Sequence, residues 1–362
     1  MTLRPYQRAS IDALYFRWRE GLGEPTIIQA PTGSGKSYII ANLIQEVVED
    51  YNARVLVLTH VAELIKQNFD ELINLWHLAP AGLYSAGLNK KEIESQILFA
   101  GIQSLEGNET KLYPAPNLVI IDECHLISPH EQSRYQKVLK NLLLMNPKVK
   151  VVGLSATPYR LDIGWLHKSD DSFFKSIAYN IEVQELIDDG YLAPVTSKAG
   201  SITLDTSSIH HRGGEFIESE LSAKAIEGDY THIALSDAFS KAKADNRKSF
   251  MIFACSVDHA NQICDELKEM GINHALVVGD TSKPERKEIV EKHKTGEIEC
   301  LVNVNVLTTG YNNPRLDTII MMRPTESPSL YVQMIGRGMR TYPGKKNCLV
   351  LDYAGNCLRH GP

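Results

Sequence analysis

Residues 30 to 37 combine glycines, a lysine and a hydroxyl in an order suited to holding phosphate. The stretch reads Ala30-Pro31-Thr32-Gly33-Ser34-Gly35-Lys36-Ser37, between an apolar β-branched run and an expected helix. Glycines let backbone N–H groups wrap a phosphate, and a helix N-terminus adds its positive dipole. In such a loop the lysine reaches the β- and γ-phosphates and the hydroxyl meets Mg²⁺. We therefore predict a nucleoside triphosphate site, although Ala30 stands where the strict pattern has glycine.

An acidic pair follows a second apolar run. Residues 118–121 lead directly into Asp122 and Glu123, and ligands bind at the carboxyl ends of strands in open α/β sheets. Asp122 would hold Mg²⁺ through water, and Glu123 would orient and deprotonate the attacking water. Alone, such a pair is more often a surface turn. Together with the phosphate loop, it predicts hydrolysis of the nucleotide.

The elements that must position these residues are visible as short apolar runs alternating with helical patterns. Nearly continuous apolar runs are typical of parallel strands buried on both faces. The expected strands are 26–30, 55–59, 97–100, 118–122, 149–154, 250–254, 275–278, 300–304, 318–322 and 349–351. The alternation predicts βαβ units. We expect two α/β domains, residues 1–192 and 193–362, with an irregular polar insertion at about 200–229.

Composition limits the class of protein. The chain has 362 residues, 43% of them hydrophobic and 23% charged, which excludes collagen, coiled coil and intrinsic disorder. A net charge of −6 excludes a protein that coats nucleic acid with one basic face. No apolar run is long enough for a membrane span, and no signal core follows the N-terminus. The six scattered cysteines favour reduced thiols. We expect a soluble, cytoplasmic monomer. The sequence leaves open whether a further domain follows the last strand.

Taken in order, the motifs resemble those of superfamily 2 helicases. The phosphate loop, Asp122-Glu123-Cys124-His125 and Ser155-Ala156-Thr157 resemble motifs I, II and III. The second half resembles motifs IV, V and VI at residues 253–256, 308–314 and 333–340, and Leu3-Arg4-Pro5-Tyr6-Gln7 resembles the adenine motif. The closest resemblance is to the bacterial RadD-type DNA-repair helicases. Asn312 departs from the pattern, because many relatives carry aspartate there.

The resemblance implies two tandem RecA-like, doubly wound parallel-sheet domains, with an ATP site in the cleft between them. It implies ATP and Mg²⁺ as cofactors, with Ser37 and Asp122 on the metal and Gln7 on adenine, supported by Arg4. The implied ATP-binding residues are Arg4, Gln7, Pro31, Thr32, Gly33, Ser34, Gly35, Lys36, Ser37 and Gly310. The implied catalytic residues are Lys36, Asp122, Glu123, Gln333, Arg337 and Arg340, the two arginines sharing one helix face and acting as arginine fingers.

The same resemblance implies a nucleic-acid strand held mainly by its phosphates. The matching positions are Thr59, His60, Gln103, Ser104, Ser256, Thr308 and Thr309. Each is equally an ordinary strand-end or cap residue. His125, Ser155 and Thr157 would couple the ATP site to that strand. We expect Lys90, Lys91, Lys345 and Lys346 to carry solvated charge.

Two functions remain open on this sequence. One is an ATP-driven translocase or helicase, with DNA favoured, acting in repair or recombination beside DNA-repair or single-strand-binding proteins. The alternative is a P-loop ATPase switch that remodels or scaffolds protein–DNA complexes without separating strands. A metabolite kinase is disfavoured by the second sheet domain with its two placed arginines. The residues alone do not choose between DNA and RNA, or between strand separation and translocation.

Overall fold

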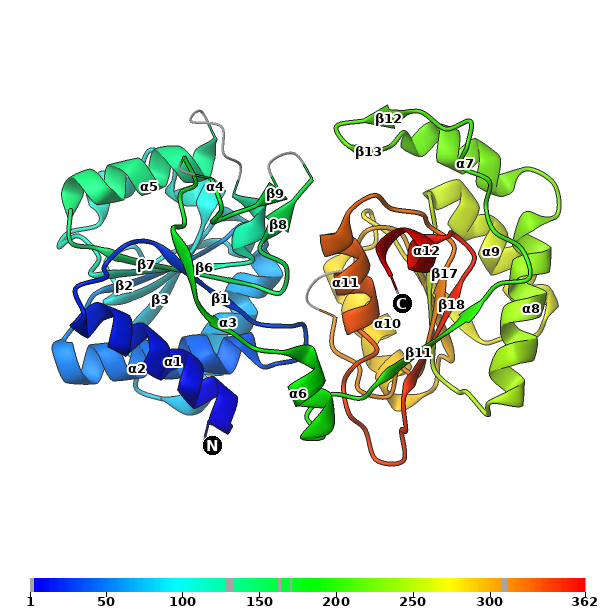
Figure 1. Ribbon diagram of the computed structural model, residues 1–362, viewed down its shortest axis with the longest axis horizontal. Helices are drawn as coiled ribbons and strands as arrows, with labels where there is room; N and C mark the ends of the chain where they lie inside the picture. The colour runs from blue at the N-terminus through cyan, green and yellow to red at the C-terminus, as the bar shows by residue number, and fades with distance from the viewer. Residues whose placement is uncertain (1–2, 128–132, 162–163, 170, 308–310, 362) are drawn as a thin grey trace. The chain divides into compact units, whose positions relative to one another are not determined.

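The computed structural model describes residues 3–127, 133–161, 164–169, 171–307 and 311–361. The chain divides into two compact units, Met1–Glu182 and Val183–Pro362, coloured blue to green and green to red in Figure 1. This division lies before the boundary expected at residue 192. The reason is that Leu192 pairs with Arg340 and the Ala193 N–H donates to the Met339 carbonyl at 2.6 Å. These bonds attach the preceding helix, α6 (Val183–Asp188), to the second unit.

The first unit is built on a mixed sheet whose strand order is β10-β1-β7-β6-β2-β5-β3-β4. Its pairs are parallel except for β3 with β4. The strands are β1 (Thr26–Gln29), β2 (Val55–Thr59), β3 (Ala81–Ser85), β4 (Lys90–Lys91), β5 (Ile97–Gly101), β6 (Leu118–Asp122), β7 (Lys150–Ser155) and β10 (Ser176–Asn180). Strands β2, β5 and β6 are buried throughout, as expected of parallel strands covered on both faces.

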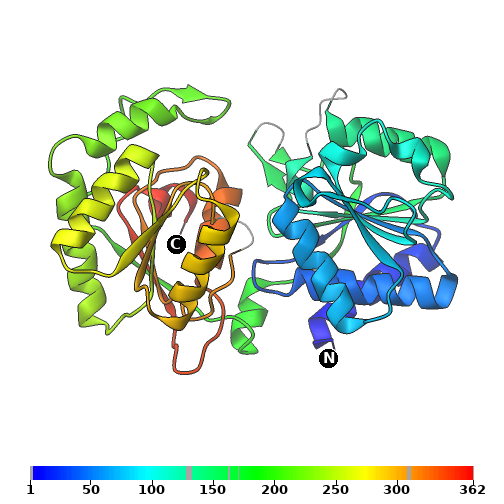
Figure 2. The ribbon, with the colours of Figure 1, turned by 180° about the vertical axis from the view of Figure 1, so that it is seen from behind.

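Helices cover both faces of this sheet (Figures 1 and 2). They are α1 (Pro5–Arg19), α2 (Lys36–Tyr51), α3 (Ala62–Leu75), α4 (Ile102–Leu105) and α5 (Arg134–Met145). A small antiparallel pair, β8 (Tyr159–Arg160) and β9 (Gly164–Trp165), and three short 3₁₀ segments, Ala86–Leu88, Glu109–Lys111 and Cys124–Leu126, complete the unit. None of the helices in the described part of the chain is long and apolar enough to cross a membrane.

The second unit has an all-parallel sheet of order β11-β18-β17-β14-β16-β15. Its strands are β11 (Val195–Ala199), β14 (Phe250–Phe253), β15 (His274–Val277), β16 (Cys300–Asn303), β17 (Thr318–Met321) and β18 (Cys348–Asp352). The helices besides α6 are α7 (Glu218–Ile226), α8 (Tyr230–Ala244), α9 (Val257–Glu269), α10 (Lys283–Thr295), α11 (Pro328–Gly336) and α12 (Asn356–His360). Figure 2 shows α8 and α9 on one face of the sheet and α10 on the other.

The insertion expected to be irregular is ordered for much of its length, so that expectation is wrong for residues 211–226. It contains the antiparallel pair β12 (His211–Arg212) and β13 (Glu215–Phe216), followed by α7. Phe216 and Leu221 are buried in the hydrophobic core that also contains strand β14 residue Ile252. These apolar side chains help to fix a segment whose composition is otherwise polar.

Candidate nucleotide and nucleic-acid sites

The phosphate loop joins the end of β1 to the start of α2. The Ala30 N–H donates to the Ser155 carbonyl at 2.9 Å, which extends the pairing of β1 with β7. Gly33 and Gly35 have φ values of 89° and 81°, a region that glycine adopts without a steric penalty. Gly35 caps α2, so the first N–H groups of that helix face the loop. The loop has the geometry expected of a phosphate cradle.

Two of the three predicted catalytic side chains of this unit, Lys36 and Glu123, lie in contact. The Lys36 Nζ is 2.5 Å from Glu123 Oε1, and both side chains are largely buried, at 13% and 12% exposed. Glu123 has a φ of 53°, a left-handed conformation that is uncommon outside glycine. The turn after β6 therefore directs the carboxylate to the lysine of the phosphate loop.

Asp122 is buried at the end of β6, with 3% of its surface exposed. Asn68 Nδ2 donates to Asp122 Oδ2 at 2.8 Å, and the Glu123 N–H donates to Oδ1 at 3.0 Å. Burial raises the pKa of Asp122, while Lys36 opposes that shift. Asn68 was not among the predicted residues. Its signal is a polar side chain within the buried stripe of α3, which also carries Ile65 and Leu72.

The residues predicted to couple ATP to the strand are also brought together. His125 Nδ1 lies 2.9 Å from Ser155 Oγ and 3.4 Å from Glu123 Oε2. Ser155 Oγ in turn accepts the Thr157 N–H at 3.1 Å. Burial lowers the pKa of His125 to about 4, against the opposing charge of Glu123. A neutral histidine thus links the acidic pair to the 155–157 segment, and Arg160 Nη1 reaches the His125 carbonyl at 3.4 Å.

Gln7 braces the phosphate loop. Its Nε2 donates to the Ser34 carbonyl at 2.9 Å, and its Oε1 accepts the Arg4 N–H at 3.0 Å. The Tyr6 hydroxyl donates to the same Ser34 carbonyl at 2.8 Å, a contact that sequence analysis missed. Adenine recognition by Gln7 and Arg4 stays a prediction, because these bonds occupy the Gln7 amide within the protein.

The residues present fit a magnesium ion of the kind that nucleotides carry. Among the described residues, no three His, Cys, Asp or Glu side chains gather to hold a metal. Mg²⁺ in phosphate-transfer sites takes one or two protein ligands and completes its shell with water and phosphate. Ser37, whose hydroxyl is 3.4 Å from Gln67 Nε2, and the buried Asp122 carboxylate would supply those ligands.

The predicted strand contacts of the first unit lie at the carboxyl ends of adjacent strands. Thr59 ends β2 and pairs in register with Gly101 of β5, and Gln103 Nε2 donates to the His60 carbonyl at 3.3 Å. The buried Thr59 hydroxyl has no hydrogen-bond partner within the described part of the chain. Ser104 differs, because its hydroxyl already accepts the Ala86 N–H at 2.9 Å.

In the second unit, both predicted arginine fingers bind one backbone carbonyl. Arg337 Nη1 and Arg340 Nη1 donate to the Tyr311 oxygen at 2.9 and 2.8 Å. The expectation that they share a helix face is wrong: α11 ends at Gly336, Arg337 is its C-cap and Arg340 lies beyond it. Glycine at 336 and 338 is a poor helix former and allows the chain to leave the helix there. Gln333 lies buried on α11.

Tyr311 is fixed by a buried network that sequence analysis did not identify. Its hydroxyl is 2.5 Å from His293 Nδ1, and His293 Nε2 is 3.2 Å from Ser249 Oγ. Asn313 Nδ2 also approaches His293 Nδ1, at 3.2 Å. Because Asn313 Oδ1 accepts the Arg315 N–H, its nitrogen faces the imidazole, and Nδ1 is the acceptor. Burial lowers the pKa of His293 to about 4, which keeps this acceptor unprotonated at neutral pH.

Three other predicted positions of this unit, Thr308, Thr309 and Gly310, lie outside the described residues. Ser256 is the N-cap of α9: its hydroxyl accepts the His259 N–H at 3.1 Å and lies 2.6 Å from the Ser222 hydroxyl. The second of these contacts was not foreseen. The predicted strand contact is thus tied to α7.

Lys345 is not the solvated charge that we expected. Its Nζ donates to the carbonyls of Gly338 and Arg340, at 2.6 and 2.8 Å, and to that of Pro314 at 3.2 Å. Backbone carbonyls at the turn after α11 replace water around the ammonium group. Lys346 is exposed, as are Lys90 and Lys91.

Comparisons with known proteins place both units among helicase-related sequences. Residues 1–160 match the family "Type III restriction enzyme, res subunit", and residues 231–342 match "Helicase conserved C-terminal domain". The chain is 31% identical over 368 residues to "Putative ATP-dependent helicase IRC3" of Saccharomyces cerevisiae, a match that covers 98% of this chain and 51% of that protein. The chain spans about half the length of the curated relatives it matches.

Two solved structures share the fold. The fragment of "a putative HsdR subunit of a type I restriction enzyme from Vibrio vulnificus YJ016" has a TM-score of 0.71 at 22% identity, over 99% of this chain and 65% of that chain. The Pyrococcus furiosus Hef helicase domain has a TM-score of 0.60 at 14% identity, over 98% of this chain and 96% of that chain. The two units are therefore tandem RecA-like domains.

Proposed function

The chain belongs to the superfamily 2 helicases, a family of ATP-hydrolysing enzymes, and we propose from this that it is a nucleic-acid-stimulated ATPase acting as a translocase or helicase. The observation that carries the proposal is the contact of Lys36 with Glu123 beside the buried Asp122. A phosphate-binding lysine, a candidate base and a candidate metal ligand occupy one small volume at the ends of β1 and β6. Hydrolysis of a nucleotide phosphate needs those three groups.

In this proposal the residues of the first unit hold and hydrolyse ATP. The Gly33–Gly35 turn and the α2 N-terminus bind the phosphates, and Lys36 leaves Glu123 to pair with them. Freed of the lysine, Glu123 accepts a proton from the attacking water. Ser37 and Asp122 would hold Mg²⁺, which would supply the charge neutralisation that phosphoryl transfer needs.

The positively charged residues of the proposal belong to the second unit. Arg337 and Arg340 lie beside each other on the Tyr311 carbonyl, and guanidinium groups stabilise the charge on a transferred phosphoryl group. The roles of Gln333, Thr308, Thr309 and Gly310 are those that the family resemblance implies.

DNA is the strand we propose, with a role in repair or recombination, because the motifs resemble those of the RadD-type group. The strand would contact Thr59, His60 and Gln103 in one unit and Ser256 in the other. Contacts to phosphates through hydroxyls and N–H groups explain how a chain of net charge −6 binds DNA. A cytoplasmic, monomeric enzyme remains our expectation.

The test is steady-state ATP turnover with a panel of single- and double-stranded DNA and RNA. Turnover that rises with a strand, and most with DNA, is the expected result. Basal turnover that no strand raises would overturn the translocase and favour the ATPase switch that remodels protein–DNA complexes.

A further inference from the structure

The inserted segment β12–β13–α7 has no part in the function described so far, yet it touches two functional places of the second unit. Its β13 end contacts the start of α11, the helix that carries Gln333 and leads into Arg337. Its α7 end contacts Ser256, the proposed strand contact. Few residues separate these two ends, since β13 ends at Phe216 and α7 begins at Glu218.

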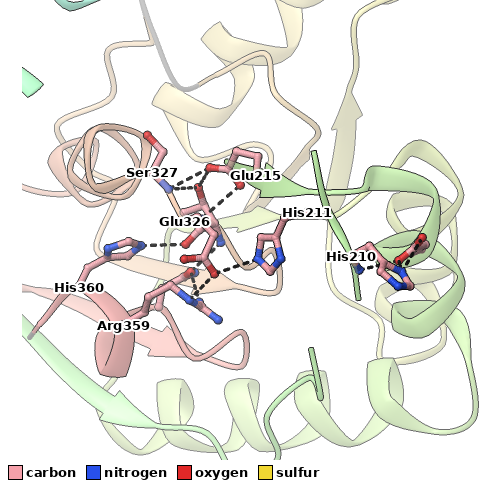
Figure 3. Close-up of polar contacts among 10 residues, drawn as sticks. His210, His211, Glu215, Glu326, Ser327, Arg359 and His360 are labelled. Atoms are coloured by element: carbon pink, nitrogen blue, oxygen red, sulfur yellow. Dashed lines mark hydrogen bonds and ion pairs between the residues drawn. The ribbon is translucent and has the colours of Figure 1, made fainter. Parts of the chain in front are cut away.

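The β13 contact is a carboxylate that gathers donors from the residues before α11. Glu215 Oε1 accepts the Thr325 hydroxyl at 2.6 Å and the Ser327 N–H at 2.9 Å, and Oε2 accepts the Glu326 N–H at 3.2 Å. Figure 3 shows the Glu215 side chain directed at this turn. Ser327 is the N-cap of α11. Hydrogen bonds to an ionised carboxylate are the strong class, so Glu215 fixes where α11 begins.

A second set of contacts holds the hairpin against the same turn. Arg359 Nε lies 2.9 Å from Glu326 Oε1, and the Arg359 guanidinium lies 5.2 Å from the centre of the Phe216 ring. His211 Nε2 is 3.6 Å from the same Glu326 oxygen, as Figure 3 shows. The hairpin, the turn before α11 and α12 are thus joined in one polar cluster.

The contact at the α7 end of the segment joins it to the start of α9. The Ser222 and Ser256 hydroxyls are 2.6 Å apart, and Ser256 begins α9 at the end of β14. A strand phosphate bound at Ser256 would compete for that hydroxyl or reorient it, and the change would reach α7 through Ser222. Because only Ile217 separates β13 from α7, a shift of α7 would also move the Glu215 carboxylate.

We propose that this segment couples strand binding at Ser256 to the position of α11, with Ser222 and Glu215 as positioning residues. The inference rests on the proposed function and adds the route by which the strand stimulates turnover within the second unit. The route needs no contact of Glu215 with nucleotide or strand: it acts through α11 and the arginines that follow it.

The closing experiment uses the full chain with Glu215→Gln. Glutamine keeps the size and one acceptor oxygen but presents N–H donors to the turn and loses the charge. We expect stimulation of turnover by saturating single-stranded DNA to fall about tenfold, within the usual range of coupling between sites, with strand affinity unchanged. The matched control is Glu220→Gln: Glu220 lies on α7 and pairs with His210, which precedes β12.

A second variant tests the α7 end of the segment. Ser222→Ala removes the hydroxyl beside Ser256 and leaves the α9 cap in place, so it should give the same loss of stimulation as Glu215→Gln. Ser219→Ala, at an exposed position of α7, is its control. Combined with Arg337→Ala, Glu215→Gln should cause no further loss of turnover, because both act on one step.

The outcomes separate the two proposals. Stimulation equal to wild type in both Glu215→Gln and Ser222→Ala, or losses that add to that of Arg337→Ala, would refute the coupling route and leave the proposed function standing. A wild-type protein that no strand stimulates would refute both.

Discussion

At the scale of single residues, the first unit contains an ion pair that the proposed mechanism has to break. Lys36 and Glu123 are both mostly buried and 2.5 Å apart, so each neutralises the charge of the other. Such a pair is stable only as a pair, because removing one partner leaves a buried charge. A bound triphosphate is the natural replacement partner for Lys36.

Glu123→Gln tests this division of roles. Glutamine keeps the size of the side chain but cannot accept a proton, so turnover should fall by about 10²–10⁴-fold while ATP still binds. Equilibrium binding of ATP and steady-state turnover, measured on one preparation, check it. Equal loss of binding and turnover would contradict the base role, and Lys36→Ala, expected to lose both, is the comparison.

Buried neutral histidines make the second unit sensitive to acid. Burial lowers the pKa of His259 and of His293 to about 4, from 6.5. Between these two values the unfolded chain therefore binds more protons than the folded chain. The free energy of unfolding decreases as pH falls from about 6.5 towards 4. At pH 7 these histidines are mostly unprotonated in both states, so this contribution is small.

His293→Gln should flatten that pH dependence. Denaturant unfolding of wild type at pH 7 and pH 5 should show a lower free energy of unfolding at pH 5, by about 1–2 kcal/mol for each such histidine. The variant should be less stable than wild type at pH 7 and show a smaller change between the two pH values. A change as large as that of wild type would exclude His293 as a contributor.

At the scale of elements, strands with continuous apolar runs were predictable, including the edge strand β15 (His274–Val277), whereas strands with an interrupted apolar pattern were not. The apolar runs at 55–59 and 118–122 match β2 and β6, because both faces of those strands are covered. Strands β10 and β11 were missed: both lie at sheet edges, and residues such as Ser176 and Lys198 interrupt their apolar pattern. Backbone hydrogen bonds to one neighbouring strand hold an edge strand in the sheet, and these bonds do not depend on side-chain type.

The candidate site, too, was only partly predictable from the sequence. The phosphate loop and acidic pair were predictable because local spacing defines them. The Asn68 contact with Asp122 and the His293–Tyr311 pair were not, since each joins side chains that only the tertiary fold brings together. The ordered insertion was missed for a related reason: Glu215 finds its partners 110–112 residues away.

Helix α1 offers a prediction at this scale. Gln7 and Tyr6 both bind the Ser34 carbonyl, so α1 supports the phosphate loop whichever base the nucleotide carries. Gln7→Ala should weaken ATP and GTP binding about equally, by roughly tenfold for the loss of a buried hydrogen bond. Titrations with both nucleotides check it, with Tyr6→Phe as a partial loss of the same support. Selective weakening of ATP would instead show that Gln7 reads adenine, as the family resemblance implies.

At the scale of the whole molecule, the functional residues are divided between two RecA-like units. The phosphate loop and acidic pair belong to Met1–Glu182, and Arg337 and Arg340 belong to Val183–Pro362. Neither unit holds a full set of the proposed catalytic groups. Nucleotide and strand must therefore act on a shared conformational equilibrium if one is to influence the other.

This requirement gives a reciprocal prediction. Nucleotide should tighten binding of single-stranded DNA by about 5–150-fold, and DNA should tighten nucleotide binding by the same factor, because the coupling free energy is shared. Glu123→Gln with ATP supplies a complex that does not turn over, and binding of a labelled oligonucleotide is measured with and without ATP at two salt concentrations. Affinity for DNA should fall at higher salt whether or not ATP is present, since the contacts are to phosphates. Unequal factors in the two directions would show an incomplete binding measurement. Factors of one in both directions would mean that nucleotide and strand bind independently and that ATP does not drive movement along a strand.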